Sequence, residues 1–386
     1  MNILLDFIPL QFNNGIGGAA TFAKKVCDEV ISQKDADTKL FATYDSTVEA
    51  SRLYNHEYIA KQANITLIDI SISPISFAIE QNKIDVFFIA IGQFYARYNL
   101  TGIECKVVMF IHDIFDIERN DNLIDLALPF TRCKGKIQWI KRVINVLSGR
   151  WEKQEKTLYG NIIQLYSAQN TIPYTVSEYS AHALKYYFPN LKKEIRVCYS
   201  PMKEMAEIKE IENKQLKDMI SSEQPYLFMI AANRRYKNPD ILIKVFERLQ
   251  KDGINLNLLT LNYGCCVNAK HTDIPFLSDS DMEHAYKHAY ALIFASLFEG
   301  FGYPPIEAFK YGTPAIVSNV TSIPEITADG GIPFSPLYPA DLYRAINVLM
   351  GSRDLYSERA KLRYKEISTR QKNDLDRLIG TLLNKN

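Results

Sequence analysis

The sequence lacks the features that mark several large classes of protein. Its 45 lysines and arginines stand against 44 aspartates and glutamates, so the net charge is only +1. A chain without excess positive charge has no global field that attracts nucleic acid, and we expect no nucleic-acid partner. The 386 residues include six cysteines, none in a Cys-x-x-Cys pair. This spacing argues against a disulfide framework or a zinc site and indicates reduced thiols in a cytoplasmic protein.

Long hydrophobic runs are also missing. No segment approaches the roughly 20 apolar residues that a membrane-spanning helix needs. The first ten residues carry no basic leader and place Asp6 inside an apolar run, so they indicate a first strand and not a signal peptide. There is no short-period repeat and no low-complexity segment. A chain of this length without repeats suits two domains of ordinary size.

Short apolar runs alternate with helical stretches, a pattern typical of α/β proteins with a doubly wound parallel sheet. The predicted strands form two sets: 3–8, 39–43, 65–70, 85–91, 106–111, 174–176 and 195–199, then 226–231, 255–261, 291–295 and 315–318. A stretch rich in Lys and Glu separates them. The predicted division is a Rossmann-like domain at 1–200, a linker at 201–224, a second Rossmann-like domain at 225–365 and a C-terminal helix at 366–386.

The most informative stretch runs from Ser296 to Ser318. It follows a buried strand and begins with a turn, Glu299-Gly-Phe-Gly302, whose glycines permit positive φ and close approach of a ligand. Pro304 or Pro305 then opens a short helix, which Gly312 closes. Strand, glycine-rich turn and helix N-terminus together predict a seat for an anion such as phosphate.

Two carboxylates, Glu299 and Glu307, frame this seat. A carboxylate repels phosphate but accepts hydrogen bonds from hydroxyl groups, so the predicted ligand is a phosphate joined to ribose or hexose. The run Glu299-Gly-Phe-Gly-Tyr-Pro-Pro-Ile-Glu307 closely resembles the donor-site signature of retaining glycosyltransferases of family 4. The resemblance implies the GT-B architecture, in which two Rossmann-like domains face a central cleft. It further implies that Glu307 binds the ribose and Glu299 the donor sugar, with Gly300, Phe301 and Gly302 near the sugar and phosphates.

A second basic loop, Asn233 to Pro239, follows a predicted strand. Arg and Lys at the end of a strand suit a diphosphate, because their charges neutralise a leaving nucleoside diphosphate. The resemblance assigns that role to Lys237 and to one of two adjacent arginines; we prefer Arg234 to Arg235. The glycine that many relatives carry before this loop is Ala231 or Ala232 here.

In the first domain, the initial strand leads into a glycine-rich turn that ends at Gly17 and Gly18. Such turns sit at the carboxyl ends of strands, where open α/β sheets bind ligands. Another predicted strand ends at His112-Asp113, and an imidazole there can bind a sugar hydroxyl or a phosphate oxygen. The resemblance places Gly17 and Gly18 near the donor diphosphate and the acceptor, and it makes His112 a catalytic candidate beside Glu299, Lys237 and Arg234.

Residues 132–151 combine an apolar helical face with many basic residues and two tryptophans. This composition favours an anionic membrane surface, or equally a helix whose apolar face packs on the sheet while its lysines face water. With membrane contact, the protein would act at the inner face of the cell membrane on a lipid-linked acceptor. The two interpretations stay open.

The implied activity is transfer of a hexose, with retention, from a GDP- or UDP-linked sugar to a glycan or lipid-linked acceptor in bacterial surface polysaccharide synthesis. The resemblance favours mannose, and it implies neither a metal nor another cofactor. Three alternatives remain: a nucleotide-sugar epimerase of the same fold, a phosphorylase, and a non-catalytic nucleotide-sugar-binding protein. Turnover with and without an acceptor or phosphate would separate them.

Overall fold

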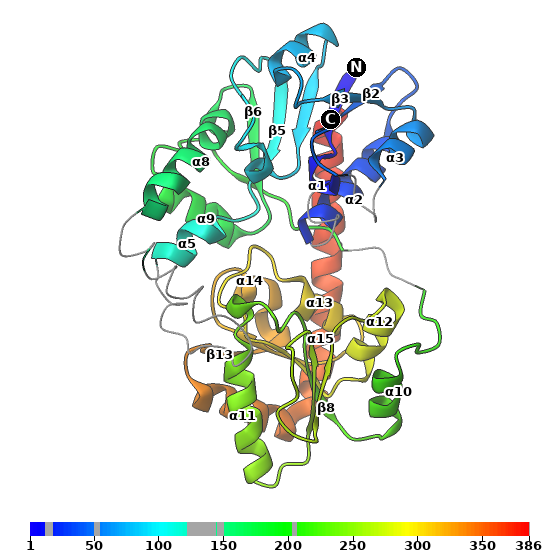
Figure 1. Ribbon diagram of the computed structural model, residues 1–386, viewed down its shortest axis with the longest axis vertical. Helices are drawn as coiled ribbons and strands as arrows, with labels where there is room; N and C mark the ends of the chain where they lie inside the picture. Colours follow the sequence, from blue (N-terminus) through cyan, green and yellow to red (C-terminus); the bar gives the residue numbers. More distant parts are fainter. Residues whose placement is uncertain (12–17, 50–54, 122–143, 145–149, 203–206, 386) are drawn as a thin grey trace. The chain divides into compact units, whose positions relative to one another are not determined.

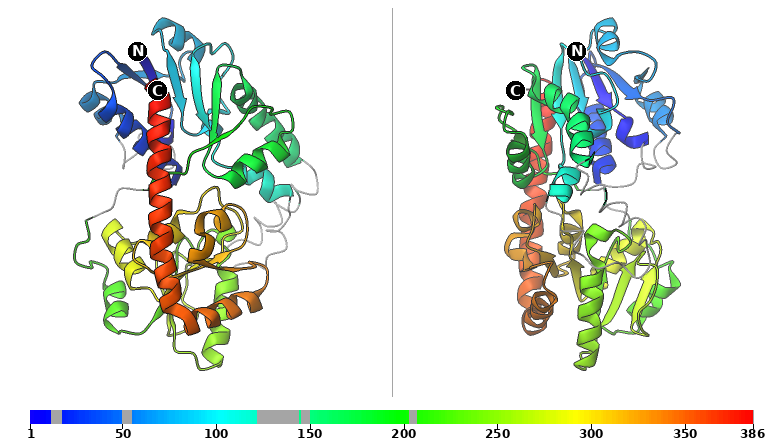
Figure 2. Two further views of the ribbon diagram at one scale, coloured as in Figure 1. Left: turned by 180° about the vertical axis from the view of Figure 1, so that it is seen from behind. Right: turned by 60° about the vertical axis from the view of Figure 1, so that its left-hand side comes forward.

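The computed structural model describes residues 1–11, 18–49, 55–121, 144, 150–202 and 207–385. The chain forms two compact units. One contains Met1–Ile117, Gly149–Lys203 and Thr369–Asn386, and the other includes Glu204–Ser368. Each unit has its own parallel sheet with helices on both faces (Figures 1 and 2).

The first unit is built on seven parallel strands in the order β3-β2-β1-β4-β5-β6-β7. They are β1 (Asn2–Asp6), β2 (Lys39–Tyr44), β3 (Thr66–Asp69), β4 (Val86–Ile89), β5 (Lys106–Phe110), β6 (Thr171–Thr175) and β7 (Arg196–Val197). The winding direction reverses between β1 and β4. Sheets of this kind bind ligands outside the carboxyl ends of the strands at such a reversal.

The helices of this part of the chain are α1 (Ile8–Gln11), α2 (Gly18–Gln33), α3 (His56–Ala63), α4 (Ile75–Gln81), η2 (Gly92–Tyr95), α5 (Phe115–Asp121), α8 (Arg150–Ser167) and α9 (Glu178–Tyr187). Alternate strand residues such as Met109 share a core with α4, α8 and α9. Their neighbours point to the other face, where the Phe110 and Phe22 rings lie 4.7 Å apart. Ser177 caps α9 by accepting the Ser180 N–H at 3.1 Å, because the first amides of a helix have no intrahelical partner.

The second unit has six parallel strands in the order β10-β9-β8-β11-β12-β13. They are β8 (Tyr226–Met229), β9 (Asn257–Leu261), β10 (His271–Ile274), β11 (Ala291–Phe294), β12 (Ala315–Ser318) and β13 (Gly331–Phe334). The helices are α10 (Lys214–Ser221), η3 (Arg235–Lys237), α11 (Pro239–Lys251), α12 (Asp279–His288), α13 (Tyr303–Phe309), α14 (Ile323–Thr327), η4 (Ala328–Gly330) and α15 (Pro339–Leu382). Here the reversal lies between β8 and β11, directly beneath the predicted donor-site loops.

All eleven predicted strands are present, but β10 and β13 were not predicted. They are the two edges of the second sheet. An edge strand is covered on fewer sides, so its sequence need not be a continuous apolar run. β10 reads His-Thr-Asp-Ile and β13 contains Pro333, which is tolerated only where an amide proton is not needed for pairing.

The segment predicted as a linker is largely part of the second unit. The Glu212 N–H donates to the buried Asp281 carboxylate at 3.0 Å, and the Lys209 N–H donates to Ser280 Oγ at 2.8 Å. Both acceptors lie on α12. The lysine-rich composition that indicated a linker belongs to the exposed face of α10, which buries Leu216 and Met219.

The C-terminal helix α15 is longer than predicted. It begins at Pro339, has a non-helical residue at Ser352, and continues to Leu382. Its residues up to Ser368 belong to the second unit, and those from Thr369 onward belong to the first. One continuous element therefore contributes to both units.

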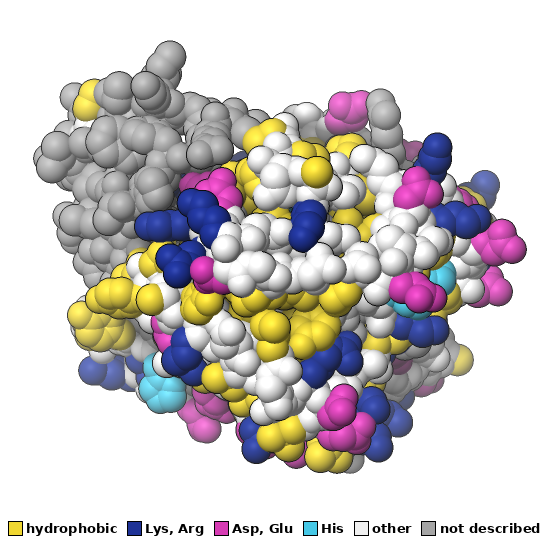
Figure 3. All heavy atoms as spheres, turned by 90° about the horizontal axis from the view of Figure 1, so that it is seen from below, with side chains coloured by type: hydrophobic (Ala, Val, Ile, Leu, Met, Phe, Trp, Pro, Cys, Tyr) yellow, Lys and Arg dark blue, Asp and Glu magenta, His cyan; other side chains and the backbone are white. Residues whose placement is uncertain are grey.

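Exposed charges of both signs are interspersed on the face drawn in Figure 3, with apolar side chains between them. The described side chains on that face form no patch of a single sign. Within the described ranges, no helix is both long enough and apolar enough to cross a bilayer. The cysteines in those ranges are free thiols, as predicted. The basic segment 132–151 falls mostly outside the described residues.

Candidate active site

The two loops that carry the donor-site motifs meet at the sheet reversal of the second unit. Lys237 follows β8 and Glu299 follows β11, and these strands are neighbours. Lys237 Nζ forms an ion pair with Glu299 Oε1, and the two side chains are only 9% and 14% exposed. The ammonium also lies 4.8 Å from the centre of the Phe294 ring, a cation–π contact. The fold thus sets a shielded lysine and a shielded carboxylate side by side where a ligand is expected.

The glycine-rich turn is held by the loop that follows β12. The Glu299 N–H donates to Thr321 Oγ1 at 3.2 Å, and the buried Ser322 Oγ lies 2.9 Å from the Glu299 carbonyl oxygen. Gly302 has φ of 99°, a conformation that side chains disfavour, and it immediately precedes α13. The helix begins at Tyr303, one residue before the predicted prolines. Because proline has no N–H, amides for an anion must come mainly from the turn and not from the helix.

Glu307 is oriented by a residue that the sequence did not single out. Tyr286, fully buried on α12, donates its hydroxyl to Glu307 Oε2 at 2.5 Å. Burial and the nearby Glu307 charge raise the pKa of Tyr286 well above its ordinary value, so the hydroxyl stays a donor. One carboxylate oxygen is thereby engaged, which fixes the direction of the other. The contact could not be predicted from a local sequence pattern, because Tyr286 and Glu307 are 21 positions apart in the chain.

The two candidate arginines differ in exposure. Arg234 is exposed and its Nη1 donates to the Tyr236 hydroxyl at 3.0 Å, whereas Arg235 is partly buried in η3. Lys237 is followed by Asn238, which adopts a left-handed conformation and donates from Nδ2 to the Pro336 carbonyl at 2.8 Å. These contacts fix the loop on which Arg234 and Lys237 lie.

Ala231, one of the two positions at which the resemblance implies a glycine, has φ of 51°. A left-handed L-residue is strained, so we expect Ala231→Gly to raise the free energy of unfolding by about 0.5–1 kcal/mol. Ala232 is buried and is not left-handed. Ala232→Gly is therefore the matched control and should lower stability by about 1 kcal/mol. Chemical denaturation of both variants measures the difference; equal destabilisation by the two changes would contradict the strain at Ala231.

In the first unit, His112 follows β5 and is partly buried. Its Nε2–H donates to the Ala90 carbonyl at 3.0 Å, and its ring meets the edge of Phe22 with centroids 4.8 Å apart. Burial lowers the pKa of His112 to about 4. The imidazole is therefore neutral at physiological pH, with Nδ1 as a hydrogen-bond acceptor.

The other first-unit predictions have different outcomes. Asp113 accepts the Phe115 N–H at 3.0 Å and so caps α5. Gly18 is exposed and begins α2, while Gly17 lies outside the described residues. No group of three or more metal-ligating His, Cys, Asp or Glu side chains occurs in the part of the chain that the structure describes.

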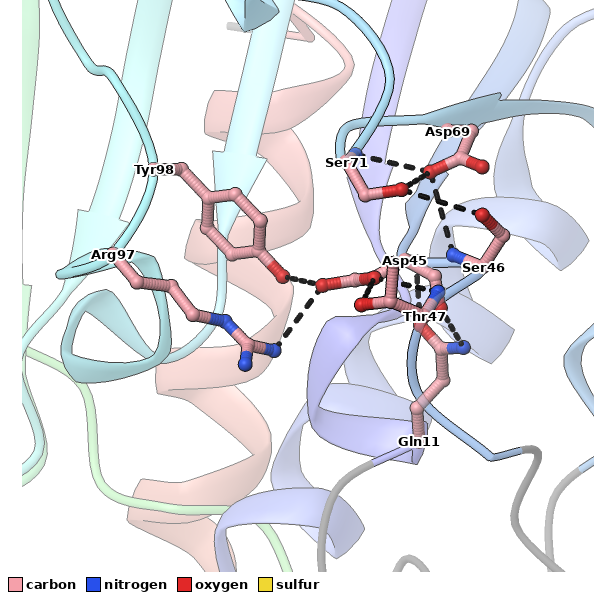
Figure 4. A network of polar contacts seen from close by, with 8 residues as sticks. All are labelled: Gln11, Asp45, Ser46, Thr47, Asp69, Ser71, Arg97 and Tyr98. Atoms are coloured by element: carbon pink, nitrogen blue, oxygen red, sulfur yellow. Dashed lines mark hydrogen bonds and ion pairs between the residues drawn. The ribbon is translucent and has the colours of Figure 1, made fainter.

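A polar network at the carboxyl ends of β2 and β3 was missed by the sequence analysis (Figure 4). Asp45, almost fully buried, accepts from the Tyr98 hydroxyl at 2.5 Å and pairs with Arg97 Nη2 at 3.2 Å. Gln11 accepts the Asp45 N–H at 2.9 Å. A polar residue directly after a buried strand was the signal used for His112, and the same signal at Asp45 would have found this network.

The match to a known family falls within the second unit. Residues 210–366 match the model of the family described as glycosyl transferases group 1. O-antigen chain mannosyltransferase B from Escherichia coli is 39% identical over 61 residues, which are 16% of this chain and 16% of that protein. O-antigen chain mannosyltransferase RfbU from Salmonella typhimurium is 29% identical over 122 residues, which are 29% of this chain and 34% of that protein. These alignments therefore span 16% and 34% of the two relatives.

Solved structures resemble the whole chain. Anabaena HepE, solved in complex with UDP-glucose, has a TM-score of 0.64 at 12% identity and full coverage of both chains. The lipopolysaccharide-biosynthesis glycosyltransferase WaaG has a TM-score of 0.60, also at 12% identity, with 99% of each chain covered. Identities this low establish the fold alone, and they confirm the predicted GT-B class. Taken with the two parallel sheets, they show a GT-B α/β fold in which residues 210–366 match the model of the group 1 glycosyl transferases.

Proposed function

We propose that the protein transfers a hexose, with retention of anomeric configuration, from a nucleotide-diphosphate sugar to a glycan or lipid-linked acceptor. The observation that carries the proposal is the shielded Lys237–Glu299 pair at the sheet reversal, with Glu307 held by Tyr286 nearby in the same unit. A cation stabilises a leaving diphosphate, and carboxylates accept sugar hydroxyls. The site therefore offers a cation for the diphosphate of the donor and carboxylates for its sugar hydroxyls.

In this proposal, Lys237 and Arg234 bind the diphosphate. Lys237 forms an ion pair with Glu299 in the structure. When the donor binds, its phosphate also pairs with the Lys237 ammonium, and the Glu299 carboxylate accepts a hydroxyl of the donor sugar. Glu307, oriented by Tyr286, accepts from the ribose hydroxyls. The turn amides around Phe301 and Gly302 lie near the sugar and phosphates. Because most of the leaving-group charge is met by side chains, the proposed reaction needs no metal and should be insensitive to EDTA.

On the acceptor side, neutral His112 offers Nδ1 to a hydroxyl group. Mannose is the proposed sugar and surface polysaccharide the proposed product, since relatives in two bacteria are O-antigen mannosyltransferases. UDP is an alternative base, because HepE was solved with UDP-glucose. The proposed location is the cytoplasm, at the membrane if the acceptor is lipid-linked.

A thermal-shift panel with GDP, UDP, ADP, TDP and their common sugars tests the donor. A ligand at a hundred times its dissociation constant should add about 2.7 kcal/mol, enough to raise the melting temperature by several degrees. We expect the nucleotides of one base to raise the melting temperature of the protein. Arg234→Ala should weaken that response by at least tenfold in affinity, whereas Arg235→Ala, the adjacent control, should change it less.

The alternatives predict other outcomes. An epimerase would convert its nucleotide sugar without an acceptor, and a phosphorylase would require phosphate. A non-catalytic sensor would bind the nucleotide sugar and release no nucleoside diphosphate with any acceptor. A panel in which no nucleotide stabilises the protein would overturn the donor assignment.

A further inference from the structure

A polar groove lies in the first unit, apart from every residue assigned above. Its floor is the sheet edge formed by β6, β7 and the residues flanking β7, and its wall is the C-terminal part of α15. The volume is about 890 Å³, within the range of ligand sites in proteins. The lining residues of α15 extend from Arg370 to Thr381, about 16 Å along the helix. A groove of this length suits an elongated ligand.

The wall of the groove is cross-linked by a buried carboxylate. Asp374 has a side chain only 1% exposed, accepts the Tyr199 N–H at 2.9 Å and pairs with Arg370 and Arg377. The Arg370 guanidinium lies 3.7 Å from the centre of the Tyr199 ring and also pairs with Glu178 at 3.3 Å. This buried carboxylate therefore ties α15 to the backbone of Tyr199, after β7, and pairs with two arginines of the groove wall.

Other charged groups in the groove have hydrogen-bonding capacity left over. The carboxylates of Glu194 and Asp376 have no hydrogen-bond or ion-pair partner within the described chain. Among the described residues, the Arg196 guanidinium contacts Tyr174, with a long hydrogen bond of 3.4 Å from Nη1 to the hydroxyl and 5.9 Å from Cζ to the ring centre. The groove thus presents unused acceptors and donors together.

The charge of the lining indicates the class of ligand. Four acidic and four basic side chains line the groove, so its net charge is zero. A phosphate or nucleotide site would carry excess positive charge, and a site for an acyl chain would be lined mainly by apolar side chains. Hydroxyl groups both donate and accept, so a neutral ligand rich in hydroxyls can satisfy carboxylates and guanidinium groups at once.

We propose that this groove is a second carbohydrate site, which binds a neutral oligosaccharide of several sugar units through Glu194, Arg196 and Asp376. The site extends the proposed function, on which it rests, because a glycan-building enzyme that holds the distal part of its acceptor or product gains affinity without new contacts at the reaction centre. It is separate from the donor site, whose residues all lie in the second unit.

Calorimetric titration of the full chain with α-linked mannotetraose and with mannose tests the proposal. We expect the tetrasaccharide to bind and mannose to bind at least tenfold more weakly. Glu194→Ala/Arg196→Ala should lower tetrasaccharide affinity at least tenfold, and Asp376→Asn several-fold. The control Lys39→Ala/Glu104→Ala removes the same charges from exposed positions outside the groove and should change nothing.

Three results would overturn the inference: no tetrasaccharide binding, binding that both groove variants leave intact, or a groove that takes pyrophosphate instead. Asp376→Asn serves as the test should the double variant not fold. The nucleotide panel, run on the same proteins, separates the two proposals. Tetrasaccharide binding that the variants weaken, without any nucleotide response, would support the groove and refute the donor site.

Discussion

Replacing Lys237 by methionine is expected to lower the transfer rate about 10²- to 10³-fold. The lysine is the most shielded of the basic groups assigned to the leaving diphosphate, and removing one such stabilising contact typically costs about 3–4 kcal/mol in the barrier. Donor affinity should fall as well, because the diphosphate is already charged in the ground state. Steady-state kinetics with the donor found in the nucleotide panel measure both effects.

A structural role for Lys237 must be separated from a catalytic one. Breaking a shielded ion pair leaves Glu299 without its counter-charge and should cost about 3 kcal/mol of stability, whereas Lys237→Met/Glu299→Gln should recover much of that loss. The transfer activity of this double variant should stay low. Lys310, paired with Glu283 at 2.7 Å and similarly shielded, is the matched control: Lys310→Met should destabilise but largely spare turnover. If Lys237→Met kept full activity, the site assignment would be wrong.

The second large effect is expected at Asp6, at the carboxyl end of β1. This fully buried carboxylate accepts from the Ile8 N–H at 3.1 Å, the Ala90 N–H at 2.8 Å and the Tyr95 hydroxyl at 2.7 Å. Asp6→Ala leaves the Ile8 and Ala90 amides buried without this acceptor, while the Tyr95 hydroxyl keeps Thr43 Oγ1 at 2.9 Å. At roughly 1–3 kcal/mol for each of the two unsatisfied amides, the free energy of unfolding should fall by about 2–6 kcal/mol, measured by urea denaturation.

Asp6 should also make stability depend on pH. Burial raises its pKa from 3.8 to about 7 in the folded chain. A raised pKa means that, between about pH 4 and 7, the folded state keeps a proton that the unfolded state has lost. The contribution of this proton to the free energy of unfolding is therefore full below about pH 4 and is lost as the pH rises through 7. Relative to Asp6→Asn, wild type should lose about 2–3 kcal/mol between pH 5 and 7, since each pH unit contributes up to about 1.4 kcal/mol.

Asp35→Asn is the control for this measurement. A hydrogen bond from Thr38 lowers the pKa of Asp35 below its ordinary value, so the carboxylate is ionised in both states between pH 5 and 7. Its stability difference from wild type should therefore stay constant across that range. A constant difference for Asp6→Asn as well would show that Asp6 is ionised in the folded protein at pH 5.

Asp6 is also linked to His112 through Ala90. The Asp6 carboxylate accepts the Ala90 N–H, and the Ala90 carbonyl accepts from His112. Replacing Asp6 should therefore also disturb the position of the His112 imidazole.

Local sequence was sufficient for the fold class and for most strands. Buried parallel strands such as β5 and β11 are continuous apolar runs, and the glycine and proline of the turn after β11 specify its conformation within a few residues. The Ser177 cap of α9 likewise involves only residues of its own helix start. Such features depend on neighbours in the chain, so a single sequence contains them. The edge strands β10 and β13 were not predicted, because partly exposed strands need not be continuous apolar runs.

The amino-acid sequence by itself determined the residues of the candidate donor site, since Lys237, Glu299 and Glu307 stand in motifs that can be read along the chain. Only the tertiary structure decided how they are held: Glu299 against Lys237, Glu307 by Tyr286, and the turn by Thr321 and Ser322. The groove on the first unit likewise forms only when α15 meets the edge of β7. These contacts join residues tens to hundreds of positions apart, and their partners are selected by the order of strands in the sheet, which no local pattern encodes.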